Sequence, residues 1–180
     1  MEPTRADRFE GLFRDSYPLV RAYALRRAGP DGAQDVVAET FLVAWRRFDE
    51  VPDDPLPWLY GTARRVLANQ RRSAARGVAL EQRMTGSVAV NREADLGDSV
   101  ADAELLRLAL RRLSDRSREA LMLVAWEGLD GARAARAAGC SRAAFAVRLH
   151  RARAQLTGAL ASLEGPPVPP PEPRTLEVNS

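Results

Sequence analysis

The chain has 180 residues and a mass of 19.8 kDa, a size that allows one ordinary domain or two small ones. All 27 basic residues are arginine, which excludes Schiff-base chemistry and a lysine-bearing phosphate loop. A single cysteine, Cys140, and a single histidine, His150, exclude an internal disulfide and a Cys/His zinc cluster, so we expect no metal, no cofactor and no enzyme. The longest apolar run, 120–126, is too short for a bilayer and the N-terminus too charged for a secretory signal. We therefore expect a cytoplasmic protein without membrane insertion.

Charge alternates along the chain, although the formal net charge is only +3. Seven acids and two arginines lie within 31–56, and five arginines without an acid lie within 57–80. Five acids without an arginine follow within 93–104, and six arginines without an acid within 131–163. Either basic segment alone reads as a solvated helical face. Two of them, about sixty residues apart, suggest two surfaces for a polyanion, with the acidic segments facing another partner.

The first half reads as helices. Apolar residues over 9–24 follow helical spacing with an expected break near Pro18, and the Gly-Pro-Asp-Gly sequence at 29–32 predicts a stop and a turn. Apolar residues then recur at intervals of three and four over 37–48, which predicts a second amphipathic helix.

The segment 51–57 predicts a loop, because proline lacks an amide donor and restricts the residue before it. A third helix is expected over 58–72. The glycine-bearing stretch 73–100 lacks sustained periodicity and reads as a linker that leaves room for helical patches. The chain is thus predicted to be all-α, with two small helical domains joined by a flexible linker. The expected parts are a first domain at 1–75, a linker at 76–102, a second domain at 103–163 and a Pro-rich, disordered tail at 164–180.

The second half predicts four helices, and Ser114 is a candidate N-cap between the first two. Their expected ranges are 105–113, 118–126, 131–138 and 142–161. A short helix, a three-residue turn opening with Gly139 and a longer arginine-bearing helix are typical of a helix-turn-helix. Gly139 suits a position with positive φ, Ser141 suits the cap of the last helix, and Cys140 reads as a small buried hydrophobe under the turn.

The last helix combines an apolar stripe with arginines. Phe145, Leu149, Ala152 and Leu156 predict an inward face at spacings of four, three and four. Arginines away from that stripe would reach phosphates or guanine edges in a major groove, and His150 among them reads as a solvent-facing or phosphate-side residue. These arginines are Arg142, Arg148, Arg151 and Arg153.

Two motifs in the first half carry a family resemblance. They are Gly-Ala-Gln-Asp-Val-Val-Ala-Glu-Thr-Phe-Leu-Val-Ala-Trp-Arg-Arg-Phe at 32–48 and Pro-Trp-Leu-Tyr-Gly-Thr-Ala-Arg-Arg-Val-Leu-Ala-Asn-Gln-Arg-Arg at 57–72. With Glu-Gly-Leu at 127–129 and Arg-Leu-His-Arg-Ala-Arg at 148–153, they resemble the sigma-70 superfamily of bacterial transcription initiation factors, and within it the extracytoplasmic-function (ECF) group. The arginine-only basicity is typical of a GC-rich genome, so a high-GC bacterial source is expected.

The resemblance implies three sets of contact residues and no catalytic ones. The helix that docks on the beta-prime clamp helices of RNA polymerase carries Asp35, Val36, Glu39, Thr40, Phe41 and Trp45, of which Asp35 and Glu39 are the better contact candidates, because the spacing of Phe41 and Trp45 suggests core packing. The −10 element would be opened and held by Asp53, Asp54, Trp58, Arg64, Arg65, Asn69, Arg71 and Arg72, with Trp58 favoured as a core anchor. The −35 element would meet Ser141, Arg142, Ala144, Ala146, Arg148, Arg151 and Arg153.

The chain departs from the family pattern at several of these positions. Arg65 stands where asparagine is common, Ala38 replaces a frequent glutamine, and the apolar residues at 144–147 replace a Thr-Val-Lys-Ser sequence. The promoter sequence is therefore not carried over.

The resemblance implies core RNA polymerase (beta-prime clamp helices and beta flap), promoter DNA and an anti-sigma factor as partners. The predicted function is an ECF sigma factor that directs the polymerase to −10 and −35 elements and promotes DNA melting. One alternative is a stand-alone helix-turn-helix regulator with an N-terminal sensor or dimerisation half. Another is a protein-interaction module whose basic surfaces bind acidic proteins.

Overall fold

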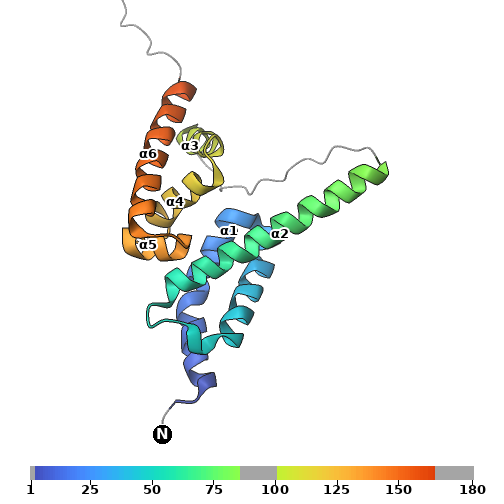
Figure 1. Ribbon diagram of the computed structural model, residues 1–180, viewed down its shortest axis with the longest axis vertical. Helices are drawn as coiled ribbons and strands as arrows, with labels where there is room; N and C mark the ends of the chain where they lie inside the picture. Colours follow the sequence, from blue (N-terminus) through green and yellow to red (C-terminus); the bar gives the residue numbers. More distant parts are fainter. Residues whose placement is uncertain (1–2, 86–100, 165–180) are drawn as a thin grey trace, which may run out of the picture.

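The computed structural model describes residues 3–85 and 101–164, and every regular element within these ranges is helical (Figure 1). The expected all-α fold is confirmed. No described helix has both the length and the apolarity needed to cross a membrane. The elements are α1 (Arg5–Arg46), the 3-10 turn η1 (Phe48–Glu50), α2 (Pro55–Thr85), α3 (Ala101–Arg111), α4 (Asp115–Ala125), α5 (Gly131–Ala138) and α6 (Arg142–Glu164).

Helix α1 is a hairpin of two arms, because the chain reverses at Gly29. Gly29 has φ 70° and ψ −179°, a conformation that side chains with a Cβ rarely adopt, so the turn expected over 29–32 is compressed into one residue. The arms lie side by side in Figure 1, and aromatic rings join them. The ring centroids are 5.0 Å apart for Phe9 and Trp45 and 4.7 Å apart for Phe13 and Phe41. The second arm is therefore held in register by the first.

The break expected near Pro18 is wrong, because the first arm stays helical through this residue. Pro18 is exposed, while Ser16, Val20 and Tyr23 around it are buried. Burial of that face offsets the helical hydrogen bond that proline cannot donate. Pro30, in contrast, opens the second arm just after the kink, where a missing amide donor has little cost.

Helix α2 is longer at both ends than the sequence suggested. It begins at Pro55 rather than near residue 58, because first-turn amides need no helical partner and proline is tolerated there. It also runs to Thr85 rather than ending near residue 72, so the first part of the expected linker, 73–85, is helical. This segment is rich in Ala, Arg, Leu, Glu and Gln, which are strong helix formers, and Gly77 alone does not outweigh them. The rest of the expected linker, 86–100, lies outside the described residues, as does the tail over 165–180.

The helix-turn-helix of the second half is confirmed in α5 and α6. Gly139 has φ 67°, and the Ser141 hydroxyl accepts a hydrogen bond from the Ala144 amide at 3.2 Å. The predicted cap at Ser114 is also present, because its hydroxyl accepts the Ser117 amide at 3.2 Å. Helices α3 and α4 begin four and three residues before their expected starts, respectively, because polar first turns escape an analysis of apolar spacing.

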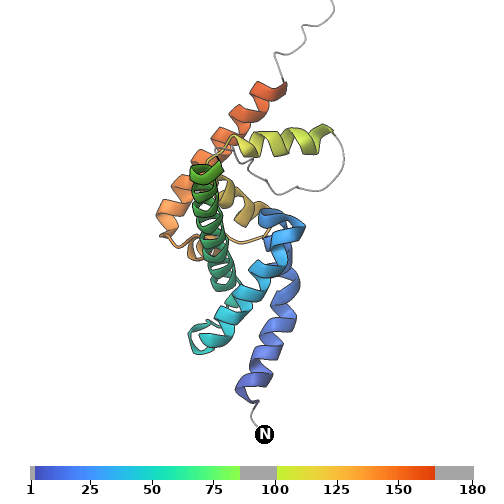
Figure 2. The same ribbon diagram turned by 90° about the vertical axis from the view of Figure 1, so that its right-hand side faces the viewer.

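The first half (3–85) and the second half (101–164) pack against each other (Figure 2). Leu59 and Tyr60 of α2 belong to one buried cluster with Leu129, Ala137 and Phe145 of the second half. A smaller cluster, with Leu110, Leu113, Leu121 and Ala152, lies within the second half alone. Two helical units are thus present, and they share a core.

Candidate functional site

An acidic and apolar face runs along the second arm of α1. Asp35, Glu39 and Leu42 follow one another at intervals of four and three, so they lie on one side of the helix, and Trp45 follows at the edge of that side. Asp35 and Glu39 are exposed, and the exposed fractions of Leu42 and Trp45 are both 40%. We call these four residues the docking face. Leu42 was not predicted, although an exposed leucine between acids could have pointed to it.

Three residues predicted to contact polymerase lie beneath this face. Val36 and Thr40 are fully buried, and Phe41 is 5% exposed. The Thr40 hydroxyl donates to the Val36 carbonyl at 2.6 Å, which satisfies its polar group inside the core. Their side chains hold the second arm on the core, as the spacing of Phe41 suggested, which leaves the exposed residues of the docking face as the stronger contact candidates.

The residues expected at the −10 element lie on the loop before α2 and along α2. Asp53, Arg65, Asn69 and Arg72 are exposed. The Arg72 guanidinium donates to the Asn69 side-chain oxygen, one helical turn away. Trp58 is half-buried against the core, as an anchor would be. Beside the loop lies a hollow of about 370 Å³ whose walls include Arg8, Phe48, Asp49, Pro52 and Asp53.

Asp54, another of these residues, is bound by the helix-turn-helix. Its carboxylate accepts hydrogen bonds from Arg133 at 2.7 and 3.0 Å and from Arg136 at 2.6 Å, both on α5. The hydrogen bonds from Arg133, supported by Arg136, lower the pKa of Asp54. On α2, Arg64 Nε donates to the Ala137 carbonyl at 3.4 Å. Two predicted DNA-contacting side chains thus face the second half.

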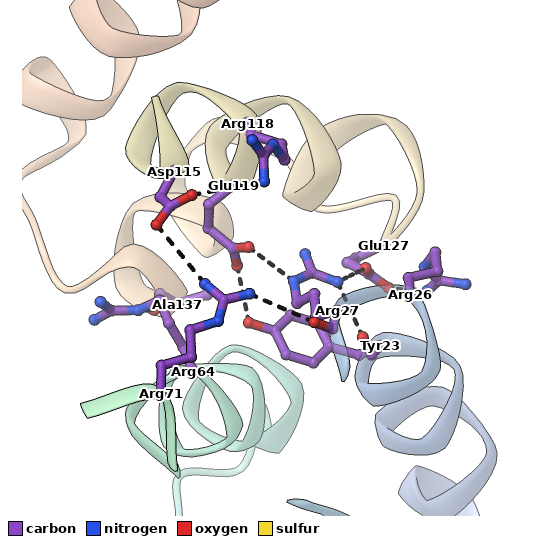
Figure 3. A network of polar contacts seen from close by, with 10 residues as sticks. All are labelled: Tyr23, Arg26, Arg27, Arg64, Arg71, Asp115, Arg118, Glu119, Glu127 and Ala137. Atoms are coloured by element: carbon purple, nitrogen blue, oxygen red, sulfur yellow. Dashed lines mark hydrogen bonds and ion pairs between the residues drawn. The ribbon is translucent and has the colours of Figure 1, made fainter. Parts of the chain in front are cut away.

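A buried polar network joins the halves around Arg27 (Figure 3). Arg27 Nε lies 2.8 Å from Glu119 Oε2, and Arg27 Nη1 lies 2.8 Å from Glu127 Oε1. The Tyr23 hydroxyl donates to Glu119 Oε1 at 2.9 Å, and Arg26 pairs with Glu127. The side chains of Arg27 and Glu127 are only 5% and 1% exposed. Buried charges persist only when they are paired, so the network fixes how the halves meet.

The ionisation of this network follows from its burial. Burial raises the pKa of the Tyr23 hydroxyl well above its ordinary value, so Tyr23 stays a neutral donor. Burial acts to lower the pKa of Arg27, but Tyr23, Glu119 and Glu127 outweigh it and raise that pKa. The Arg27 guanidinium also lies over the Tyr23 ring, 3.5 Å from its centroid. Arg27 is therefore a permanent cation at this position.

At the edge of the network, Arg71 approaches the second half from α2. Its Nη1 lies 3.8 Å from Asp115, and its Nη2 donates to the Arg27 carbonyl at 3.4 Å (Figure 3). The sequence did not suggest any of these contacts, because they join residues that are about 40 to 100 positions apart and follow no local pattern. We call the whole contact between the halves the joint. It comprises Tyr23, Arg26, Arg27, Asp54, Gly61, Arg64 and Arg71 of the first half and Asp115, Glu119, Glu127, Arg133, Arg136 and Ala137 of the second.

The residues expected at the −35 element line the outer side of α6. Arg148 is half-buried, and the others are exposed, namely Ser141, Arg142, Ala144, Ala146, Arg151 and Arg153. The predicted inward stripe is confirmed, with Phe145 and Ala152 at 1% and 0% exposure. A hollow of about 610 Å³ between α4 and α6 is lined by Ala144, Arg148 and Arg151 and also by Arg116 and Val147, which were not predicted.

Cys140, expected to be buried, is half-buried and packs against the shared core. Among the described residues, no group of His, Cys, Asp or Glu side chains is arranged to hold a metal ion.

Comparisons with protein families match both halves in order. Residues 12–77 match the family model Sigma-70 region 2, and residues 103–156 match Sigma-70, region 4. The ECF RNA polymerase sigma factor EcfG of Rhodopseudomonas palustris is 33% identical over 147 residues, which cover 79% of this chain and 80% of that protein. SigL of Mycobacterium tuberculosis, another ECF sigma factor, is 30% identical over 78% of this chain and 82% of its own.

Solved structures agree with these matches. The sigma factor RpoE in complex with the anti-sigma factor NepR from Bartonella quintana has a TM-score of 0.64 and 28% identity, covering 84% of this chain and 96% of that one. CnrH in complex with the cytosolic domain of CnrY has a TM-score of 0.56 and 25% identity, covering 84% and 86%. These findings do not favour a stand-alone regulator. The chain belongs to the ECF group of the sigma-70 family, whose members act with RNA polymerase in transcription initiation and are not enzymes.

Proposed function

We propose that this sigma factor binds core RNA polymerase through the docking face and directs it to promoters through two separate DNA-binding surfaces. The proposed location is the cytoplasm, where polymerase and promoter DNA are found. The observation that carries the proposal is an exposed acidic and apolar helix face on the region 2 half, in the same chain as an arginine-bearing helix-turn-helix on the region 4 half.

The docking face suits a basic protein partner with an apolar centre. Asp35 and Glu39 provide exposed carboxylates that steer and orient such a partner, and Leu42 and Trp45 provide apolar area to bury. The aromatic contacts between the arms of α1 hold this face in place before binding, which lowers the entropy lost on association. The beta-prime clamp helices named above are the partner that we assign to it, and the beta flap is assigned to the region 4 half.

The −10 surface would work by holding one strand of melted DNA. Exposed Arg65 and Arg72 suit the backbone of a single strand, since cationic side chains track phosphates without reading bases. A base lifted from the stack needs a pocket, and the hollow of about 370 Å³ beside Asp53 is a candidate for it.

The −35 surface would place the N-terminal part of α6 in a major groove. Arg142, Arg148, Arg151 and Arg153 then contact phosphates or guanine edges. Ala144 and Val147 offer apolar contact in place of polar side chains, and a thymine methyl group is the base feature that such residues suit.

Transcription with purified components tests this proposal. Core polymerase and genomic DNA from the source bacterium are incubated with the chain, and the 5′ ends of the transcripts are mapped. We expect defined start sites with the wild-type chain and their loss in the double variant Asp35→Arg/Glu39→Arg. The matched control is Asp15→Arg, which reverses an exposed acid on the other arm of α1.

Start sites that survive the double variant would contradict the assignment of the docking face. The sigma-factor role would be contradicted if neither the wild-type chain nor any variant gave start sites while the free chain bound one duplex sequence tightly. That result would favour a regulator.

An anti-sigma factor is a further proposed partner. Two of the similar structures are complexes of a sigma factor with an anti-sigma factor, NepR in one and CnrY in the other. A pull-down with the tagged chain, followed by identification of the captured protein and an assay of its effect on transcription, tests this partner. A captured protein that leaves transcription unchanged would contradict it.

A further inference from the structure

The first turn of α1 contacts the end of the second arm. Arg5 Nη2 donates to the Trp45 carbonyl at 2.8 Å, and the central carbon of the Arg5 guanidinium lies 5.2 Å from the centroid of the Trp45 ring. Forty positions separate the two residues, so their contact depends on the reversal of the chain at Gly29. Arg5 lies before the segment that matches region 2, because that match begins at residue 12.

The contact suits a cation in two ways. Trp45 lies in the last turn of the second arm, where backbone carbonyls lack a helical amide to pair with. A cation is favourable there, since it faces the negative end of the helix dipole. The same guanidinium lies over the indole ring, whose face attracts cations. One side chain thus contacts both the backbone and the ring of Trp45.

Neighbouring side chains in the first two turns of α1 complete the arrangement. Phe9 follows Arg5 by one helical turn and meets the Trp45 ring edge to face, with centroids 5.0 Å apart. Phe9 also contacts Phe48 at 5.7 Å, and the Arg8 guanidinium lies over the Phe48 ring at 5.6 Å. The start of α1 is therefore attached both to the end of the second arm and to the 3-10 turn that follows it.

The backbone that carries Arg5 is itself fixed. The Thr4 hydroxyl accepts the Asp7 amide at 3.2 Å, and the Asp7 carboxylate accepts the Thr4 amide at 2.8 Å, which forms a capping box. Hydrogen bonds from Thr4 lower the pKa of the Asp7 carboxyl. Arg5 is the first residue of α1 and thus projects from a capped helical turn.

Trp45 is the residue of the docking face for which this support matters most. It is the largest apolar side chain of that face and is 40% exposed. A tryptophan anchor contributes most to binding when its ring is already ordered, because ordering it on association costs affinity. Arg5 would repel a basic partner directly, so a favourable effect of Arg5 on docking has to pass through Trp45.

We propose that Arg5 is a positioning residue for polymerase docking, which holds the Trp45 indole in place for its partner. This inference rests on the proposed function, and it extends the docking element to a turn of the chain outside the region 2 match. The sign of the effect is diagnostic. Removal of a positive charge alone would strengthen binding to a basic partner, whereas loss of positioning weakens it.

The affinity for core RNA polymerase tests the proposal. Full-length chains are immobilised through a C-terminal tag and titrated with core polymerase from the source bacterium. We expect Arg5→Ala to weaken binding about fivefold. The matched control is Arg14→Ala, which removes the same charge from an exposed pair with Glu10 on the same arm, and we expect it to leave the affinity unchanged. Unchanged or tighter binding of Arg5→Ala would overturn the inference, as would an equal loss in Arg14→Ala.

A second background shows whether Arg5 acts through the indole. Trp45→Leu keeps an apolar side chain on the docking face but has no ring for Arg5 to hold. We expect Arg5→Ala to weaken the binding of Trp45→Leu by less than about twofold, because the two changes remove the same interaction. A full fivefold loss in this background would overturn the positioning role.

Fluorescence reports on the indole itself. In chains that keep Trp45 as their only tryptophan, with Trp58→Phe and Trp126→Phe, quenching by acrylamide measures access to the ring. We expect Arg5→Ala to raise the quenching constant and Arg14→Ala to leave it unchanged. Weaker polymerase binding by Arg5→Ala without a change in quenching would overturn the inference.

Failure of the proposed function would give a different result. If the wild-type chain did not bind core polymerase, or if Asp35→Arg/Glu39→Arg bound as tightly as the wild type, the docking face itself would be contradicted. Loss of binding in that double variant, together with wild-type affinity in Arg5→Ala, would overturn the role of Arg5 alone.

Discussion

Arg27 and Glu127 form an ion pair of 2.8 Å between side chains that are 5% and 1% exposed, although 100 positions separate them in the sequence. The pair joins the kinked helix of region 2 to the turn that follows α4 in region 4. Removal of the Glu127 carboxylate would leave Arg26 without this ion-pair partner and the buried Arg27 with Glu119 as its remaining carboxylate partner.

The first prediction concerns the cooperativity of unfolding. Glu127→Ala removes one partner of this pair, which costs about 3 kcal/mol when the site stays closed. We expect the wild type to unfold in one transition. We expect the variant to unfold in two, because its halves are no longer coupled and each unfolds at its own midpoint. Fluorescence of Trp126 reports on the second half and that of Trp45 on the first, in chains that keep only one tryptophan. A single coincident transition in Glu127→Ala would show that apolar contacts alone couple the halves, and Glu10→Ala, at an exposed pair, is the control.

A second prediction concerns the turn of the helix-turn-helix. Gly139→Ala places a Cβ at φ 67° and within 3.2 Å of Arg64, so we expect a loss of about 1 kcal/mol in the free energy of unfolding. The same change at exposed Gly158, in the interior of α6, is expected to gain about 0.5 to 1 kcal/mol. Urea denaturation measures both. Equal effects at the two positions would show that the turn tolerates a Cβ.

The third prediction concerns alkaline pH. Burial raises the pKa of Tyr60 to about 12, against about 10 in an unfolded chain. The neutral form is thus favoured by folding, so its contribution is complete below pH 10 and is lost as the pH rises toward 12. We expect the free energy of unfolding to fall by about 2 kcal/mol over this window, and by less in Tyr60→Phe. The chain has no lysine that would titrate in this window. If the free energy of unfolding depended on pH in the same way in Tyr60→Phe, the effect would be assigned to Tyr23, whose pKa is also raised by burial.

The fourth prediction concerns the start of α4. The Ser114 hydroxyl accepts the Ser117 amide, which otherwise has no helical partner. We expect Ser114→Ala to lower the free energy of unfolding by about 1 kcal/mol and Ser114→Asp to retain most of the stability. Ser73→Ala, at an exposed position within α2, serves as the control, and thermal unfolding is the measurement. A loss as large at Ser73 as at Ser114 would contradict the capping role.

Local chemistry made much of this fold predictable from the sequence. Gly139, Ser141 and Ser114 each act within one turn of their own position, so the helix-turn-helix and its caps follow from residue type and spacing. The inward stripe with Phe145 and Ala152 follows from the helical period in the same way.

Predictions failed where long-range packing or weak preferences decide the structure. The helix through Pro18 persists because its neighbours are buried by residues far away in the sequence, and α2 continues beyond residue 72 because many small preferences add up. Among the candidate contact residues, the burial of Phe41 was indicated by its spacing, but the family motif alone did not show that Val36 and Thr40 are buried as well. The joint escaped prediction altogether, since no local pattern links Asp54 to Arg133.

The single-residue reversal at Gly29 limits how the length of region 2 can change. The two arms of α1 are joined by two ring contacts, Phe13 with Phe41 and Phe9 with Trp45. No loop lies between the arms to absorb a change in length. A residue inserted in one arm would turn everything beyond it by about 100°, which would swing Asp35 and Glu39 out of line with the rings behind them. Insertions and deletions within 5–46 should therefore be tolerated far less than substitutions of exposed residues there.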